Sequence, residues 1–129
     1  MNMPVITALY TGILAILVVL LGARIAYNRF SRRIGIGDGG DAGMQRLVRV
    51  HGNAAENVPL ALVLLLVAEL IGTPSAWLHG FGVALVAGRV LHAFGLSRSP
   101  GTTFGRFAGT LLTWGTMLLM ATMLVVHSV

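Results

Sequence analysis

The sequence predicts an all-α membrane protein, a single domain over residues 1–129 built as an up-and-down bundle of four transmembrane helices. Three observations carry this prediction. Hydrophobic residues make up 56% of the chain and charged residues only 10%, whereas a soluble domain has about 25% charged residues. Four apolar segments each approach the roughly 20 residues that a helix needs to cross the hydrocarbon core. One tight turn and two modest loops join them, which is typical of such bundles.

The four helices are expected over residues 5–27, 47–71, 75–95 and 104–127. The first apolar run is too long for the core of a signal peptide and no basic residue precedes it, so it is expected to be retained. Ser75, which ends the turn that begins at Gly72, is a candidate N-cap for the third helix. Pro59 lies inside the second helix and lacks an N–H, so it is expected to free the carbonyl of Ala55 and to favour a kink.

The placement of charge predicts the orientation. The net charge of +5 comes from nine basic residues, all arginine, against four acidic ones. In a chain this apolar, the arginines indicate topology rather than contacts to a nucleic acid, and no nucleic-acid partner is expected. The positive-inside rule places the two arginine-bearing loops in the cytoplasm and both termini outside. The loop arginines are Arg29, Arg32, Arg33 and Arg46 in the first connection, and Arg98 and Arg106 in the third.

Two common kinds of site are not indicated. The chain has no cysteine, which excludes disulfides, thiolate ligands and a cysteine nucleophile, and no metal site is expected. The first connection contains the pattern G-x-G-x-x-G at Gly35, Gly37 and Gly40. A dinucleotide site needs a strand before this pattern and a helix that opens at its last glycine. An arginine-rich helix end precedes it here, so the pattern favours a flexible cytoplasmic loop.

The most informative feature is a set of polar residues inside the second apolar segment. Arg49, Asn53 and Glu56 are spaced i, i+4 and i+7, so they share one face of a helix, which we call the polar stripe. Each charged group placed in a bilayer costs roughly 2.5–3.5 kcal/mol on insertion scales. The polar stripe is therefore expected to meet a partner or to serve a function.

The other segments add polar groups at a similar depth. Counted along the helices from the turn at Gly72, Glu56 and Arg89 both lie a little over about 20 Å deep. All four segments therefore bring polar groups to the cytoplasmic half, while the outer half stays apolar. The remaining members are His92, one turn beyond Arg89, Arg24 near the end of the first segment, and Arg106 near the start of the fourth.

This polar layer has two interpretations. Glu56 and Arg89 could form a buried ion pair, because buried charges are normally paired. However, four arginines outnumber the one deep carboxylate, which favours a small anionic ligand that bears carboxylates. Glu56 would then suit a ligand ammonium group and Asn53 a peptide group, and glutathione has this chemistry. The four arginines are Arg24, Arg49, Arg89 and Arg106.

Several residues outside the polar layer are expected to have a structural role, in helix packing or at the membrane surfaces. The spacing of four between Ala84 and Gly88, and between Gly105 and Gly109, is expected to let helices approach closely. Glu69, near the end of the second segment, is expected to be solvated. Interfacial positions are expected for Tyr10, Trp77, His79 and His127 on the outer side, and for Arg98 at the headgroups of the other side.

Two motifs carry a family resemblance. The polar stripe, with Pro59 three residues after Glu56, resembles the second-helix signature of the MAPEG superfamily (membrane-associated proteins in eicosanoid and glutathione metabolism). Gly88-Arg-Val-Leu-His92 resembles the third-helix signature, and Arg106 follows at about the family's spacing. The resemblance covers essentially the whole chain and extends to small bacterial inner-membrane members.

The resemblance implies a homotrimer in a bacterial inner membrane, with glutathione bound between neighbouring subunits near the cytoplasm. It implies glutathione contacts from the polar stripe, with His92 lining the same site and Arg24 matching an arginine of the first helix. Arg106 would approach the thiol and be the catalytic residue. Two positions depart from the family pattern: Leu96 stands where a tyrosine is frequent, and Asn57 replaces a frequent aromatic residue or threonine.

Three functions follow from these observations. The leading one is a glutathione-dependent transferase or peroxidase that acts on small lipophilic electrophiles from the bilayer. The alternative is a non-catalytic glutathione-binding or scaffold protein of the same fold, and the two departures leave activity open. A small multidrug exporter would need a carboxylate in the first helix to couple protons, and residues 5–27 contain none.

Overall fold

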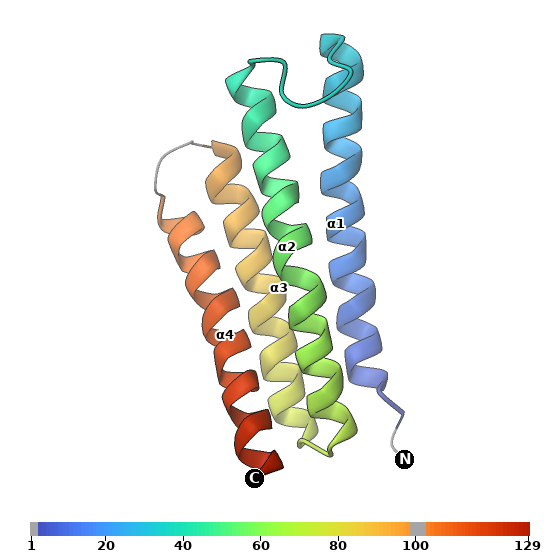
Figure 1. Ribbon diagram of the computed structural model, residues 1–129, viewed down its shortest axis with the longest axis vertical. Coiled ribbons are helices and arrows are strands. Elements are labelled where there is room, and N and C mark those ends of the chain that lie inside the picture. The colour runs from blue at the N-terminus through green and yellow to red at the C-terminus, as the bar shows by residue number, and fades with distance from the viewer. Residues whose placement is uncertain (1–2, 99–102) are drawn as a thin grey trace.

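Four long helices form the protein, and the computed structural model describes residues 3–98 and 103–129, with the side chains of residues 96–98 left out. Within these ranges, all four helices are long and apolar enough to cross a membrane, as predicted. Figure 1 shows them running up and down, with the start of α1, the end of α4 and the α2–α3 turn at one end, which we call the hairpin end. The opposite end is the arginine-rich end. The helices are α1 (Val5–Arg32), α2 (Ala42–Leu70), α3 (Ser75–Arg98) and α4 (Phe104–Ser128).

The first two helices extend further at the arginine-rich end than predicted. α1 continues to Arg32 and α2 already begins at Ala42. Asp41 caps α2, because its carboxylate accepts a 2.7 Å hydrogen bond from the Met44 N–H. That hydrogen bond and the charge of Arg32 hold the pKa of the Asp41 carboxyl below its ordinary value. With 28 residues, α1 is about 42 Å long, so its arginine-rich end reaches beyond a hydrocarbon core of about 30 Å.

The glycine-rich connection between α1 and α2 is a hydrogen-bonded turn. Gly37, Gly39 and Gly40 have φ values of +68°, +60° and +77°, in the left-handed region that favours glycine. The Gly40 N–H donates to the Asp38 carboxylate at 2.9 Å, and the Arg29 side chain donates to the Gly37 carbonyl at 3.0 Å. The segment follows a helix rather than a strand, so it lacks the setting of a dinucleotide-binding loop.

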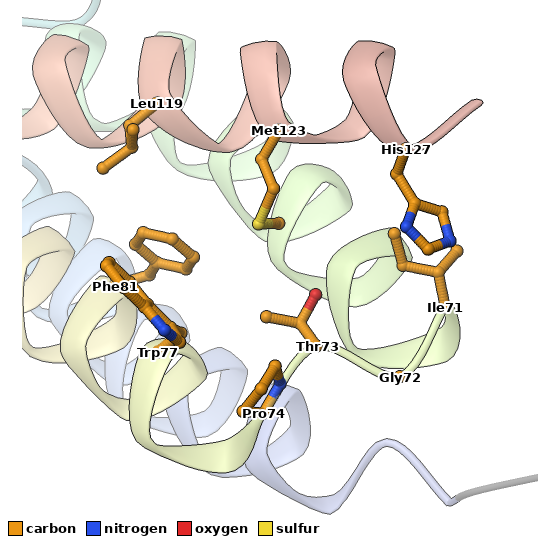
Figure 2. A pocket seen from close by; sticks show the side chains of 9 residues that line it. All are labelled: Ile71, Gly72, Thr73, Pro74, Trp77, Phe81, Leu119, Met123 and His127. Carbon is orange, nitrogen blue, oxygen red and sulfur yellow. The ribbon is translucent and has the colours of Figure 1, made fainter. Parts of the chain in front are cut away.

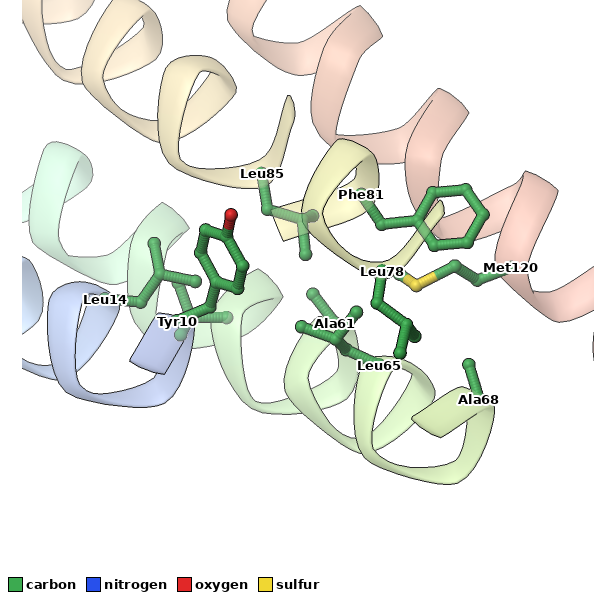
Figure 3. Packing of buried hydrophobic residues seen from close by; sticks show 10 residues of the cluster. Tyr10, Leu14, Ala61, Leu65, Ala68, Leu78, Phe81, Leu85 and Met120 are labelled. Atoms are coloured by element: carbon green, nitrogen blue, oxygen red, sulfur yellow. The ribbon is translucent and has the colours of Figure 1, made fainter. Parts of the chain in front are cut away.

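The main hydrophobic core fills the hairpin half of the bundle, and all four helices contribute to it (Figure 3). Leu14, Leu65 and Leu85 are completely or almost completely buried there, together with Met120. Burial of these side chains fixes how the four helices pack against one another. Pro59 lies inside α2, and the helix continues through it without interruption.

Tyr10 belongs to this core, and its predicted place in an outer aromatic belt is wrong. Its side chain is 5% exposed. The hydroxyl lies 3.0 Å from Nδ1 of His79 and donates to the His79 carbonyl at 3.2 Å. Gly82 makes room for the ring, because a Cβ there would lie 2.2 Å from a ring atom. The Tyr10 ring is therefore buried where its hydroxyl can bond to His79 of α3. Trp77, in contrast, is exposed as predicted.

Glu69 is buried, which corrects the prediction that it is solvated. Only 7% of the residue is exposed. Its carboxylate accepts hydrogen bonds from the Ile6 N–H at 2.9 Å and the Thr7 N–H at 2.6 Å, at the start of α1. A helix start leaves N–H groups without partners in the helix, and its dipole favours negative charge. Because Pro4 gives α1 no side-chain cap, the carboxylate of α2 takes over that role.

Glycines bring α3 and α4 into close contact, as their spacing predicted. A Cβ on Gly109 would lie 2.5 Å from the Gly88 carbonyl oxygen and 2.5 Å from the His92 nitrogen. A Cβ on Gly95 would lie 2.8 Å from the carbonyl carbon of Gly105. The close approach therefore lies within one chain and in the arginine-rich half of these two helices.

Candidate ligand site

The polar stripe of α2 is divided between two surroundings. Arg49 and Glu56 lie on the outside of the bundle with side chains 55% and 61% exposed, and Nη1 of Arg49 is 3.5 Å from Oε1 of Glu56. Asn53 turns toward α3. At 3.6 residues per turn, Arg49 and Glu56 lie within about 20° of each other around the helix, whereas Asn53 is rotated from them by about 40–60°. Because of this rotation, the Asn53 side chain contacts α3, whereas those of Arg49 and Glu56 lie on the outside of the bundle.

A buried arginine connects three helices. Arg89 of α3 is only 3% exposed. Its Nη1 donates a short hydrogen bond to Oδ1 of Asn53 on α2, and its Nε donates to the Thr113 hydroxyl of α4 at 3.0 Å. That hydroxyl donates in turn to the Gly109 carbonyl at 2.8 Å. Two neutral oxygens therefore accept from this guanidinium group.

The alternative of a buried ion pair between Glu56 and Arg89 is wrong. Glu56 lies on the outer face of α2 and pairs with Arg49 of its own helix. Arg89 lies inside the bundle and bonds to Asn53 and Thr113. Glu56 therefore faces the outside of the bundle, whereas Arg89 lies in its interior.

His92 lies in the same interior region as Arg89, one turn further along α3. It is 3% exposed. Gly109 of α4 packs against its backbone, since a Cβ there would also lie 2.8 Å from the His92 Cα. Arg89 and His92 are therefore interior residues of the four-helix bundle, whereas Arg49 and Glu56 are surface residues.

The chain matches the sequence pattern of the MAPEG family over residues 7–126. It belongs to the MAPEG family. Among its relatives is the inner membrane protein YecN of Escherichia coli strain K12, 35% identical over 115 residues that cover 89% of this chain and 86% of YecN. YecN of Escherichia coli O6:H1 strain CFT073 matches to the same extent. Inner-membrane relatives and four membrane-spanning helices agree on a membrane protein.

Two further arginines of this MAPEG protein lie toward the arginine-rich end. Arg24 is exposed on α1, where its carbonyl accepts a 2.8 Å hydrogen bond from the Asn28 side chain. Arg106 is half-buried in the first turn of α4, and its N–H donates to the Thr103 hydroxyl that caps this helix, at 3.2 Å. The predictions for the side chains of Arg98 and Leu96 lie outside the described residues.

Sequence reasoning missed one polar contact of the MAPEG chain beside the polar stripe. Oδ1 of Asn57 accepts from the Trp114 indole N–H at 2.9 Å, and Nδ2 of Asn57 donates to the Asn53 carbonyl at 2.8 Å. The spacing of four between Asn53 and Asn57 was visible in the sequence. Nothing in the sequence indicated that Trp114, on α4, would be the partner.

Proposed function

We propose that this protein binds glutathione at an interface between the subunits of a homotrimer, and that Arg49 and Glu56 form the centre of the site. One observation carries the proposal. Arg49 and Glu56 are surface residues of the subunit, yet Glu56 lies about 22 Å along α2 from the turn, well inside a core of about 30 Å. Arg49 lies about 33 Å from the turn, at the cytoplasmic edge of the core. In a single subunit the exposed Glu56 carboxylate would face lipid, at a cost of roughly 2.5–3.5 kcal/mol. A neighbouring subunit and a charged ligand would remove that cost.

The chemistry of the exposed pair fits glutathione. The Arg49 guanidinium can bind a carboxylate in a bidentate manner. The Glu56 carboxylate can accept hydrogen bonds from an ammonium group. A ligand that carries both charges can replace their direct 3.5 Å contact with two shorter ones. Asn53 borders this pair, and Arg24 supplies further positive charge on an exposed face of α1.

The direction of insertion agrees with this ligand. The arginine-rich end is assigned to the cytoplasm by the positive-inside rule, and both termini to the outside. Glutathione keeps thiols reduced in the cytosol, so it is available on that side. The proposed reaction is transfer or peroxide chemistry on a small lipophilic electrophile from the bilayer, with Arg106 beside the glutathione sulfur.

The first test concerns assembly. We expect native mass spectrometry of the purified protein in mild detergent to give mainly a trimer, because the polar stripe needs a covering subunit. Mainly monomer under the mildest conditions would contradict the interface between subunits, and so would an Arg49→Leu, Glu56→Leu variant that forms trimers of unchanged stability.

The second test concerns the ligand. We expect the purified protein to bind glutathione saturably, and Glu56→Gln to weaken the binding at least about tenfold, because the ligand ammonium group then lacks its buried counter-charge. Equilibrium dialysis with radiolabelled glutathione measures this. Asp38→Asn is the matched control, since Asp38 is a carboxylate of the α1–α2 connection. Absence of saturable binding, or equal losses in both variants, would remove Glu56 from the site.

A further inference from the structure

A pocket at the hairpin end has no role in the proposed function. It has a volume of about 460 Å³ and lies between the first turns of α3, the last turns of α4 and the turn that joins α2 to α3. Figure 2 shows Leu119 and Met123 entering it from α4, and Trp77 and Phe81 bounding it on α3. It shares no residue with the glutathione site, which lies at the other end of the bundle.

The pocket follows from how α3 and α4 pack. Their glycine contacts, Gly88 with Gly109 and Gly95 with Gly105, lie in the arginine-rich half. In the hairpin half the facing residues are the bulky Phe81, Leu119 and Met123. The pocket therefore lies where side chains, rather than glycines, stand between the two helices.

The lining changes from apolar to polar along the membrane normal. Phe81, 5% exposed, closes the deep side, and the Trp77 ring packs against it with ring centres 6.0 Å apart. At the hairpin end, Figure 2 shows the Thr73 hydroxyl turned toward the space and the His127 imidazole at its edge. The site therefore offers an apolar interior and hydrogen-bonding groups at the membrane surface.

The surroundings of the pocket indicate where its occupant comes from. Trp77 and Leu119 at its margin are exposed, as is Val126 on the last turns of α4, and these faces contact lipid in a membrane-spanning helix. Apolar walls beside lipid gain dispersion contacts from an apolar chain that lies against them. Its volume lies in the lower part of the range of about 300–1,000 Å³ for small-molecule sites, which suits one chain.

We propose that this pocket binds a single-chain amphiphile of the fatty-acid class, taken from the leaflet at the hairpin end. The acyl chain lies against Phe81, Leu119 and Met123. The carboxylate accepts hydrogen bonds from the Thr73 hydroxyl and the His127 imidazole N–H. A phospholipid, with two chains and a bulky headgroup, fits this volume less well.

Tryptophan fluorescence tests the proposal. The chain has two tryptophans, so Trp114→Phe leaves Trp77 as the only reporter. The protein is placed in phosphatidylcholine nanodiscs and titrated with a dibrominated fatty acid, whose bromine atoms quench on contact. We expect saturable quenching that the unbrominated fatty acid reverses. Quenching that rises without saturation, or that brominated phosphatidylcholine reproduces at equal mole fraction, would show ordinary bilayer contact and overturn the proposal.

Two pairs of variants in this background locate the ligand. Leu119→Phe fills the pocket and is expected to raise the half-saturating concentration by about fivefold or more, whereas Leu118→Phe, at a neighbouring position 69% exposed, leaves it unchanged. Thr73→Val removes the hydroxyl and should raise the half-saturating concentration of the fatty acid about fivefold. Thr122→Val is its control, because the Thr122 hydroxyl already donates to the Leu118 carbonyl at 2.9 Å. Equal behaviour within either pair would place the fatty acid elsewhere.

Discussion

Replacing Gly109 with leucine is expected to prevent α3 and α4 from packing and to leave little folded protein. A Cβ at this position would lie 2.5 Å from two backbone atoms, the Gly88 oxygen and the His92 nitrogen. Backbone atoms of a packed helix cannot move aside as a flexible side chain can. Overpacking costs about 1–3 kcal/mol and occasionally more, and here separation of the helices also strains the bond between Arg89 and Thr113. We therefore expect Gly109→Leu to lower the free energy of unfolding by more than about 3 kcal/mol.

Gly115→Leu is the matched control for this experiment. Gly115 lies on the same helix, and a Cβ there meets no atom within 4 Å. The yield of monodisperse protein and the thermal unfolding followed by circular dichroism compare the two variants. If both unfold at the same temperature as the parent protein, the close contact between α3 and α4 is not what holds them together.

Arg106→Ala is expected to lower the rate of glutathione conjugation about a hundredfold while glutathione binding stays nearly unchanged. A free thiol has a pKa of about 8.5, and lowering it by about two units needs roughly 2.7 kcal/mol of thiolate stabilisation. In the proposed site, the Arg106 charge and the N-terminal dipole of α4, where Thr103 caps the helix, provide this stabilisation. An interaction with the sulfur charge acts on reactivity, whereas carboxylate contacts act on affinity.

Ultraviolet absorbance of the bound thiolate should fall in parallel with the conjugation rate toward a model electrophile. Arg33→Ala is the control, because Arg33 is an exposed arginine at the same end of the bundle. If Arg33→Ala loses the thiolate signal and Arg106→Ala keeps it, the glutathione thiol does not lie beside Arg106 of α4 as proposed. If the parent protein binds glutathione without forming a thiolate or a conjugate, the non-catalytic alternative is the better description.

The sequence predicted the helices best within the hydrocarbon core, where a spanning helix must carry apolar side chains. Apolar runs mark the part of a helix that lies in hydrocarbon, so all four spans were recognised. The arginine-rich ends of α1 and α2 were placed five residues short of Arg32 and five residues beyond Ala42. Outside the hydrocarbon, polar residues extend a helix without any hydropathy signal, and a local cap such as that of Asp41 decides where it begins.

The candidate site was predictable in its spacing but not in its pairing. Periodicity placed Arg49, Asn53 and Glu56 on one side of α2. It could not show that Asn53 would bind Arg89 while Glu56 turned away from it, because a rotation of about 40–60° decides which neighbour a side chain meets. Glu69 was misjudged for a related reason, since its partners lie more than sixty residues away on α1.

The contact of Glu69 with the start of α1 also sets a register. α1 is apolar along most of its length, and its aliphatic contacts alone would permit a slide of one turn, about 5.4 Å. Tyr10 opposes such a slide, because its ring lies against Gly82 and its hydroxyl bonds to His79 of α3. Such a slide would separate the Glu69 carboxylate from the Ile6 and Thr7 N–H groups that it holds at 2.9 and 2.6 Å. Directional hydrogen bonds at the hairpin end thus fix the position of α1 along its axis relative to its neighbouring helices. Because α1 is one continuous helix, its position at Ile6 and Thr7 also sets the depth of Arg24 in the membrane. The Glu69 carboxylate at the hairpin end therefore determines the depth of an arginine near the opposite end.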